Sequence, residues 1–416
     1  MNVSSFQIHQ SCPQCGGTVV LEETDRILQC PFCRVRLFVD QRPHFSYVLP
    51  PAPARKDLLL VPYWRFRGLV FALDGDRVVH RVLDTSACAA DPLPGLPCSL
   101  GLRPQALPLR FAGPESPGRF LAASVPRKEF LKRLGHGLRG RLKATSGKPF
   151  FQAFIGETLS LIHSPVFQED GAWVDAVTGR RISPGAIPPE VPVEPPRPAP
   201  SPSPPVFRPT LCPHCGDDLE GDRDTLVLFC RNCDSFWEMG PTGFQRVEAS
   251  FSHNDLPDAA WVPFWVLDIS CGGLPLETVG DFVRLANLPQ RTPPGAASRP
   301  FRFLVPAFKV SPKHLLRLAR FATVAQPDLP PRSKAPRNGL YPVTLPALEA
   351  FQFTPILLGA VATAKEDFFP RIRGARFAFR AKRLLFLPLR RLGAEWIQDE
   401  LGCALPMNAL RWGRRL

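Results

Sequence analysis

The chain has 416 residues, which is enough for two to four domains, and its formal net charge of +14 favours acidic partners such as nucleic acid or an acidic protein surface. Its 50 prolines disfavour long helices and favour short strands and turns. There is no run of 18 apolar residues and the N-terminus lacks the form of a secretion signal, so we expect a cytoplasmic protein without a membrane span.

Eight of the 12 cysteines form two groups with the same spacing. Each group holds two Cys-x-x-Cys pairs separated by 14 residues. Two such pairs facing each other place four thiolates around one Zn²⁺, and Gly16 and Gly216 supply sharp turns after the first pairs. Short strands are expected between the pairs, at 18–21 and 27–29 in the first group and 225–229 in the second. The predicted ligands of two structural Zn²⁺ ions are Cys12, Cys15, Cys30, Cys33, Cys212, Cys215, Cys230 and Cys233.

Three other interpretations of these cysteines remain open. Disulfides would require an oxidising compartment, which the expected cytoplasmic location disfavours. Four thiolates also suit iron, as in rubredoxin, because the ligand set alone does not separate the two metals. A thioredoxin-like redox pair needs one Cys-x-x-Cys at a helix N-terminus rather than two facing pairs. His214, inside the second group, is expected at the surface. The remaining Cys88, Cys98, Cys271 and Cys403 are expected to behave as small apolar residues.

Over roughly 30 residues per copy, the cysteine pattern resembles the zinc-ribbon superfamily. That resemblance implies closed, structural sites, since a hairpin this small needs its metal to fold. Each copy is followed by a Val-Pro-aromatic-Trp stretch ending at Trp64 or Trp265, and the chain ends on Asn-Ala-Leu-Arg-Trp-Gly (408–413). With these features the chain resembles a group of uncharacterised bacterial double-zinc-ribbon proteins, a resemblance that implies no activity.

The order of landmarks predicts a tandem duplication. A basic stretch opened by proline follows in each half, at 124–134 and 310–319, and is expected to form a short helix. Both halves contain a long apolar run, at 154–162 and 377–389, which is expected to form a strand and is followed by a Trp and a Gly. Chance recurrence in a proline-rich chain is the alternative. The predicted fold is α+β, with two four-cysteine zinc ribbons each followed by a small, mostly antiparallel β domain with a short basic helix. The predicted domains are ribbon 1 (1–45), its α+β domain (46–182), a proline-rich linker (183–209), ribbon 2 (210–250) and its α+β domain (251–416).

The linker is expected to be a semi-rigid polyproline spacer, with binding to a proline-recognising module as the alternative. Two further loops, at 289–300 and 327–346, are expected to be exposed.

Basic residues cluster in two regions and are the predicted contacts for nucleic acid or an acidic partner. The ribbons themselves carry acidic residues such as Glu22, Glu23 and Asp25 at their expected hairpin tips, so the basic helices and C-terminal strands would make the contact. The predicted contact residues are Arg127, Lys128, Lys132, Arg133, Arg139, Arg141, Lys143, Lys313, Arg317, Arg320, Arg380, Lys382 and Arg383.

No nucleotide-binding, metalloprotease or serine-hydrolase motif is present. The neighbouring pairs His80 and Asp84, and His163 and Glu157, are expected at the surface or at strand ends. We therefore expect a non-enzymatic zinc protein that serves as an interaction scaffold or assembly factor for a protein partner. The alternative is a nucleic-acid-binding accessory protein.

Overall fold

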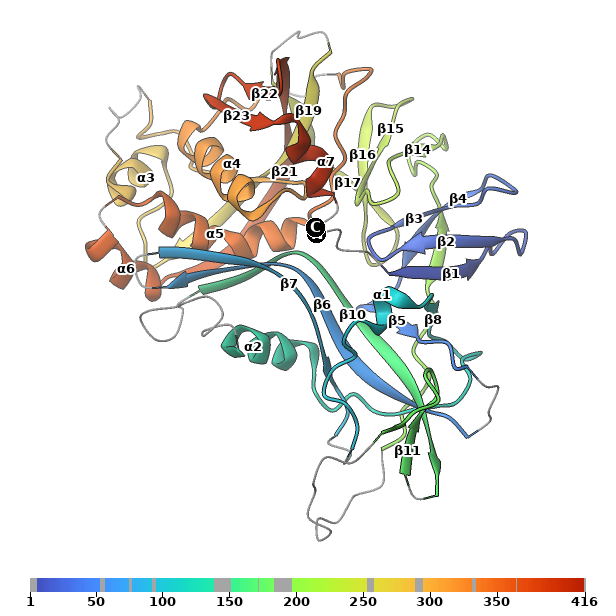
Figure 1. The fold of residues 1–416 in the computed structure, drawn as a ribbon. Helices are drawn as coiled ribbons and strands as arrows, with labels where there is room; N and C mark the ends of the chain where they lie inside the picture. The colour runs from blue at the N-terminus through green and yellow to red at the C-terminus, as the bar shows by residue number, and fades with distance from the viewer. Residues whose placement is uncertain are drawn as a thin grey trace. The chain divides into compact units, whose positions relative to one another are not determined.

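The computed structural model describes residues 6–52, 57–74, 77–91, 95–137, 151–170, 172–182, 197–252, 258–288, 295–330, 334–363 and 365–414. Within them the fold is α+β with mostly antiparallel sheets (Figure 1). The chain forms two compact units. Unit 1 contains Met1–Arg67, Leu83–Gly137 and Glu157–Thr210, and unit 2 contains Gly68–Val82, Leu138–Gly156 and Leu211–Leu416. None of the helices in the described ranges is long and apolar enough to cross a membrane.

The first cysteine group lies in unit 1 among five short strands. The two expected strands are present, but β2 pairs with β1 and β3 pairs with β4, so they do not pair with each other. The third strand of the β3–β4 sheet is β13, which comes from far along the chain. The strands are β1 (Gln7–Ser11), β2 (Thr18–Glu22), β3 (Ile27–Gln29), β4 (Arg36–Asp40) and β13 (Val206–Pro209).

The eight-stranded sheet contains β6, whose 16 residues are all buried and whose residues 68–74 are assigned to unit 2. The long strand β10 covers the predicted apolar run, and α2 begins directly after Pro126, as the proline predicted. The strands are β5 (Phe45–Val48), β6 (Leu59–Asp74), β7 (Arg77–Cys88), β8 (Arg110–Phe111), β9 (Arg119–Phe120), β10 (Phe151–Glu169), β11 (Ala172–Asp175) and β12 (Arg181–Ile182). The helices are α1 (Arg103–Ala106) and α2 (Arg127–Gly137).

The end of the proline-rich stretch belongs to unit 1, which corrects the expectation of a spacer there. The Ala199 N–H donates to the Phe120 carbonyl at 2.9 Å, and the Gln41 side chain donates to the Ser203 carbonyl at 2.6 Å. Strand β13 then completes the sheet beside β4. Residues 183–196 lie outside the described residues, so the spacer prediction stands untested there.

Unit 2 places the second cysteine group in a four-stranded sheet in the order β14-β15-β16-β17. Its six-stranded sheet has the order β20-β19-β21-β22-β23, with β18 parallel to β21. The strands are β14 (Leu219–Glu220), β15 (Val227–Cys230), β16 (Ser235–Met239), β17 (Phe244–Val247), β18 (Ala249–Phe251), β19 (Ala260–Gly272), β20 (Phe303–Pro306), β21 (Arg376–Leu392), β22 (Glu395–Gln398) and β23 (Cys403–Pro406). The helices are α3 (Val279–Ala286), α4 (Pro312–Ala325), α5 (Ala347–Val361), α6 (Lys365–Arg373) and α7 (Met407–Gly413).

Helix α5, which the sequence analysis did not predict, lies in the core of unit 2. Most of its residues are buried, including Pro355 within the helix. Phe353 packs edge-on against Phe71, with ring centroids 4.8 Å apart, so the later part of β6 contributes to this core. Unit 2 therefore includes residues from the stretch assigned to the first α+β domain by sequence.

The sheets of the two units share strand register. In unit 1, Gln168 pairs with Trp173, and Trp173 pairs with Ile182. In unit 2, Arg391 pairs with Trp396, and Trp396 with Leu405, so each counterpart lies 223 positions later. The proline of each Val-Pro-aromatic-Trp stretch also accepts a similar backbone hydrogen bond. The Ala89 N–H donates to the Pro62 carbonyl at 2.9 Å, and the Ala307 N–H donates to the Pro263 carbonyl at 2.8 Å.

The indole hydrogen bonds revise which helices correspond. Trp64 Nε1–H donates to the Val125 carbonyl just before α2, and Trp265 Nε1–H donates to the Leu345 carbonyl just before α5, both at 2.7 Å. By this contact the position of α2 matches that of α5, whereas the prolines in the sequence had matched α2 with α4. A proline precedes or begins each of the three helices, at Pro126, Pro312 and Pro346, so the prolines alone do not distinguish α4 from α5 as the match for α2.

Candidate metal centres

The first cysteine group converges on one point. The four sulfurs of Cys12, Cys15, Cys30 and Cys33 all lie within 4.8 Å of one another. The Sγ atoms of Cys12 and Cys33 are 3.7 Å apart, and those of Cys15 and Cys30 are 3.6 Å apart. Zn–S bonds of about 2.3 Å in a tetrahedron put the sulfurs roughly 3.8 Å apart, so this spacing fits one zinc ion.

The second group has the same geometry. Its four sulfurs lie within 4.8 Å of one another, with Cys212 and Cys233 at 3.6 Å and Cys215 and Cys230 at 3.4 Å. None of the eight forms a disulfide. The exposed His214 does not belong to this cluster, as the sequence analysis expected.

Tight turns bring the paired cysteines together. The Gly16 N–H donates to the Cys12 carbonyl at 2.8 Å, and the Gly216 N–H donates to the Cys212 carbonyl at 2.9 Å. Both glycines adopt positive φ, +75° and +79°, a conformation that glycine adopts without a steric cost.

Each turn also aims backbone N–H groups at a sulfur. Burial of Cys30 disfavours its thiolate, but hydrogen bonds from the Cys33 and Phe32 backbone outweigh this and lower the pKa of Cys30 to about 6. In the second group burial again opposes ionisation, and backbone hydrogen bonds from Cys215 and His214 lower the pKa of Cys212 to about 6. Backbone donors of this kind stabilise thiolates, the form that binds a metal.

In each cluster another thiol has a raised pKa. Burial and the neighbouring cysteines raise the pKa of Cys230 to about 12. For Cys33 a backbone hydrogen bond from Val35 opposes the change, but burial and the three neighbouring thiols raise its pKa to about 12. A divalent cation relieves this repulsion, so the donor set fits a bound metal with all four positions filled by cysteine.

Two polar side chains that the sequence analysis missed support Cys233. The Ser235 hydroxyl lies 2.9 Å from the Cys233 sulfur, and Trp237 Nε1–H donates to that hydroxyl at 2.8 Å. The indole thereby orients Ser235 so that its proton can point to the sulfur. The Cys-x-Ser-x-Trp spacing was visible in the sequence, but nothing in it indicated that these side chains would meet.

The acidic residues expected at the tip of the first hairpin are partly buried, which corrects the sequence analysis. Glu23 is only 2 % exposed and forms an ion pair with Arg65. Arg65 also lies 3.0 Å from Asp84, and its guanidinium stacks over the Phe6 ring. Asp25 turns inward and accepts the Glu22 N–H at 2.8 Å. The Glu23 carboxylate therefore ties the loop between β2 and β3 to β6.

The predicted contact residues are distributed over both units. On α2, Arg127, Lys128, Lys132 and Arg133 are exposed, and the last two form ion pairs with Glu129. The predicted contacts Arg139, Arg141 and Lys143 lie outside the described residues.

In unit 2 the predicted contacts differ in how they are engaged. Lys313, Arg317 and Arg320 are exposed on α4. On β21, Arg380 pairs with Glu277, Lys382 pairs with Glu238, and Arg383 is half-buried at the edge of a cavity.

Three further expectations need revision or lie beyond the described side chains. His163 is buried, not at the surface, and its Nδ1 lies 3.2 Å from the Tyr47 carbonyl. Cys271 and Cys403 are buried as expected, whereas Cys98 is exposed. The Glu157 side chain lies outside the described residues.

In comparisons with known proteins, no family model, no curated protein and no solved structure matches this chain. The likeness to zinc ribbons therefore rests on the two four-cysteine clusters and the turns that build them.

Proposed function

We propose that the protein holds two structural Zn²⁺ ions, one in each four-cysteine cluster, and acts as a non-enzymatic interaction scaffold or assembly factor. The observation that carries the proposal is the convergence of four sulfurs within 4.8 Å in both clusters. Four cysteines complete the coordination of zinc, which leaves no open position for substrate. The metal would then fix the fold of each hairpin, contributing roughly 10–16 kcal/mol at neutral pH.

Iron is the alternative metal, because four thiolates also bind iron. Metal analysis of protein purified from cells grown with both metals separates the two. Colourless protein with zinc supports the proposal, whereas a red protein with visible absorption bands and stoichiometric iron contradicts it.

The buried charged groups in unit 1 support a structural rather than a catalytic use of this chemistry. Glu23 is engaged by Arg65, and Asp175 is engaged by Arg103 at 2.6 Å. Such pairs fix strands in place when both partners are present. A scaffold acts through rigid surfaces, so the test is capture of protein partners from cell extract, with nuclease added in one arm. Partners retained after nuclease treatment support a protein scaffold, and loss of all partners contradicts it.

We further propose that the chain arose by tandem duplication, with residues 1–182 and 210–416 as the two repeats. The shared offset of 223 positions across two strand pairings supports this, as do the matched indole hydrogen bonds of Trp64 and Trp265. Chance does not readily reproduce both the register and the side-chain contact.

A nucleic-acid-binding accessory role is the second candidate, and one face of α4 favours it. Lys313, Arg317 and Arg320 recur at helical spacing and are exposed, and Arg317 stacks over the exposed ring of Phe321 at 5.6 Å. A basic face with an aromatic ring suits phosphates and bases. Binding of mixed-sequence nucleic acid that weakens steeply with salt, and that is lost when these three basic residues become Ala, supports this role. Absence of binding at about 50 mM salt excludes it.

A further inference from the structure

Both units contain a short strand that lies parallel to the long strand of its sheet. In unit 1, Ser46 of β5 pairs with Leu161 of β10, and in unit 2, Ala249 of β18 pairs with Leu384 of β21. The next hydrogen bonds also match, since the Leu49 N–H donates to the His163 carbonyl and the Ser252 N–H donates to the Phe386 carbonyl, both at 3.0 Å. Along a strand, the N–H and C=O groups of successive residues point alternately to the two neighbouring edges. The N–H and C=O groups of Ser46 and of Ala249 therefore point away from the long strand.

In unit 1 this outer edge is occupied by β8, which runs antiparallel to β5. Phe111 pairs with Tyr47, and the Ala112 N–H donates to the Ser46 carbonyl at 2.8 Å. The Phe111 ring packs against Tyr47 and Phe45, with ring centroids 5.3 and 6.0 Å apart. An extended segment with one aromatic residue therefore completes the sheet here.

In unit 2 the counterpart edge has no such strand among the described residues. The only strand there that pairs with β18 is β21, and the outward N–H and C=O of Ala249 have no hydrogen-bond partner in the described parts of the chain. The counterparts of Tyr47 and Phe45 are Ser250 and Glu248, so two aromatic rings are replaced by smaller or polar side chains.

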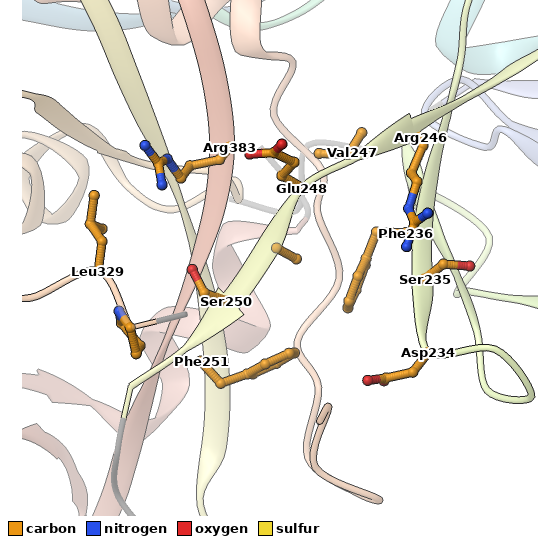
Figure 2. Close-up of a pocket in the computed structure, with 12 residues that line it drawn as sticks. Asp234, Ser235, Phe236, Arg246, Val247, Glu248, Ser250, Phe251, Leu329 and Arg383 are labelled. Atoms are coloured by element: carbon orange, nitrogen blue, oxygen red, sulfur yellow. The ribbon is translucent and has the colours of Figure 1, made fainter. Parts of the chain in front are cut away.

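A cavity of about 540 Å³ lies along this strand. It is lined by Ser250, Leu329 and Arg383 among others, and Figure 2 shows Glu248 between the side chains of Arg246 and Arg383. The lining residues Phe236 and Phe251 have buried rings that pack on each other, with centroids 6.1 Å apart. Phe236 belongs to β16 and directly follows Ser235, whose hydroxyl contacts the last cysteine of the group, so the wall of the cavity is anchored to the candidate metal site.

We propose that the outer edge of β18 is a strand-accepting site for an extended, aromatic-bearing peptide of a partner protein, bound antiparallel at the place where β5 holds β8. A peptide N–H donates to the Ala249 carbonyl, and the aromatic side chain opposite Ser250 fills the cavity. Main-chain hydrogen bonds supply the docking and the cavity supplies the preference for an aromatic ring. The site would be one contact surface of the scaffold, so it rests on the proposed function.

The test uses the full chain and a fluorescent octapeptide with the sequence of residues 107–114, which contains β8. We expect saturable binding by fluorescence anisotropy, and at least tenfold weaker binding of the peptide whose phenylalanine is replaced by alanine. In the protein, Ala249→Pro removes the outward N–H and places a ring on the edge while leaving the bonds to β21 intact. We expect this variant, with unchanged zinc content, to bind at least tenfold more weakly.

Hydrogen–deuterium exchange of the unmodified protein locates the peptide independently of any variant. Protection of residues 246–252 supports the proposal. Absence of binding, binding unaffected by Ala249→Pro, or protection at residues 45–49, where the peptide would have displaced β8, overturns it. A protein that binds two zinc ions and captures partners from extract, yet gives no protection at β18, would reject this site alone and leave the proposed function intact.

Discussion

Replacing Glu23 with alanine should destabilise unit 1 far more than replacing its neighbour Glu22. Glu23 is 2 % exposed and compensates Arg65, which is equally buried, and it also lies 3.7 Å from Arg67. Removing one partner of a buried ion pair leaves an uncompensated charge and typically costs about 3–5 kcal/mol. Arg65 keeps its contact with Asp84 in this variant, and we expect a loss of about 3 kcal/mol for Glu23→Ala, at the lower end of that range.

Glu22→Ala is the matched control, because Glu22 is the adjacent residue of the same type and is exposed. An exposed substitution of this kind changes the free energy of unfolding by about 0.5 kcal/mol or less. Urea unfolding of the zinc-loaded proteins, followed by circular dichroism and tryptophan fluorescence, measures both. Glu23→Gln, which keeps the hydrogen-bonding shape without the charge, should fall between them. A loss below about 1 kcal/mol for Glu23→Ala would refute the inference that this carboxylate ties the loop between β2 and β3 to β6.

Three further predictions test other parts of the structure. Burial outweighs the contact with the Tyr47 carbonyl and lowers the pKa of His163 to about 4, below the value of about 6.5 in the unfolded chain. The unfolded chain therefore binds a proton at higher pH than the folded protein does. As a result the free energy of unfolding decreases as the pH drops from 6.5 towards 4. The destabilisation caused by His163→Gln should therefore be about 2 kcal/mol smaller at pH 5 than at pH 7 in parallel urea titrations, and an equal effect at both pH values would contradict the burial of a neutral imidazole. Trp64→Phe and Trp265→Phe should each lower the free energy of unfolding by about 1–3 kcal/mol, because each substitution leaves a backbone carbonyl without its hydrogen-bond donor. Losses that differ by more than about 2 kcal/mol would argue against equivalent roles for the two tryptophans. Arg414→Ala removes the ion pairs to Asp222 and Asp224 and should speed amide hydrogen exchange in the second cysteine segment. Arg411→Ala, at an exposed position, is the control and should not change the exchange. Identical exchange in both variants would show that the ion pairs do not stabilise this segment.

The parts of the fold that the sequence predicted are those with short-range signals. The cysteine clusters follow from the Cys-x-x-Cys spacing and the glycines, because ligand convergence is decided within a few residues. The apolar runs predicted β10 and β21, and the proline-opened stretches predicted α2 and α4.

The parts that the sequence did not predict depend on distant partners. Glu23 and Arg65 are 42 positions apart, so nothing near Glu23 indicated that its charge would be buried. Strand β13 lies in a proline-rich stretch and forms because β4 presents an edge that it can pair with. Helix α5 contains Pro355, and a proline inside a helix argues against that helix until its packing is known.

Zinc content in matched cysteine variants tests the central claim most directly. Elemental analysis of purified protein should give two zinc ions per chain, and Cys30→Ser and Cys230→Ser should each retain one, because the two clusters are separate sets of four sulfurs. Chelation should then unfold both cysteine-bearing segments, measured as a loss of amide protection at residues 12–33 and 212–233. Protein that contains no stoichiometric metal, or whose mass shows that these cysteines are joined as disulfides, would contradict the account.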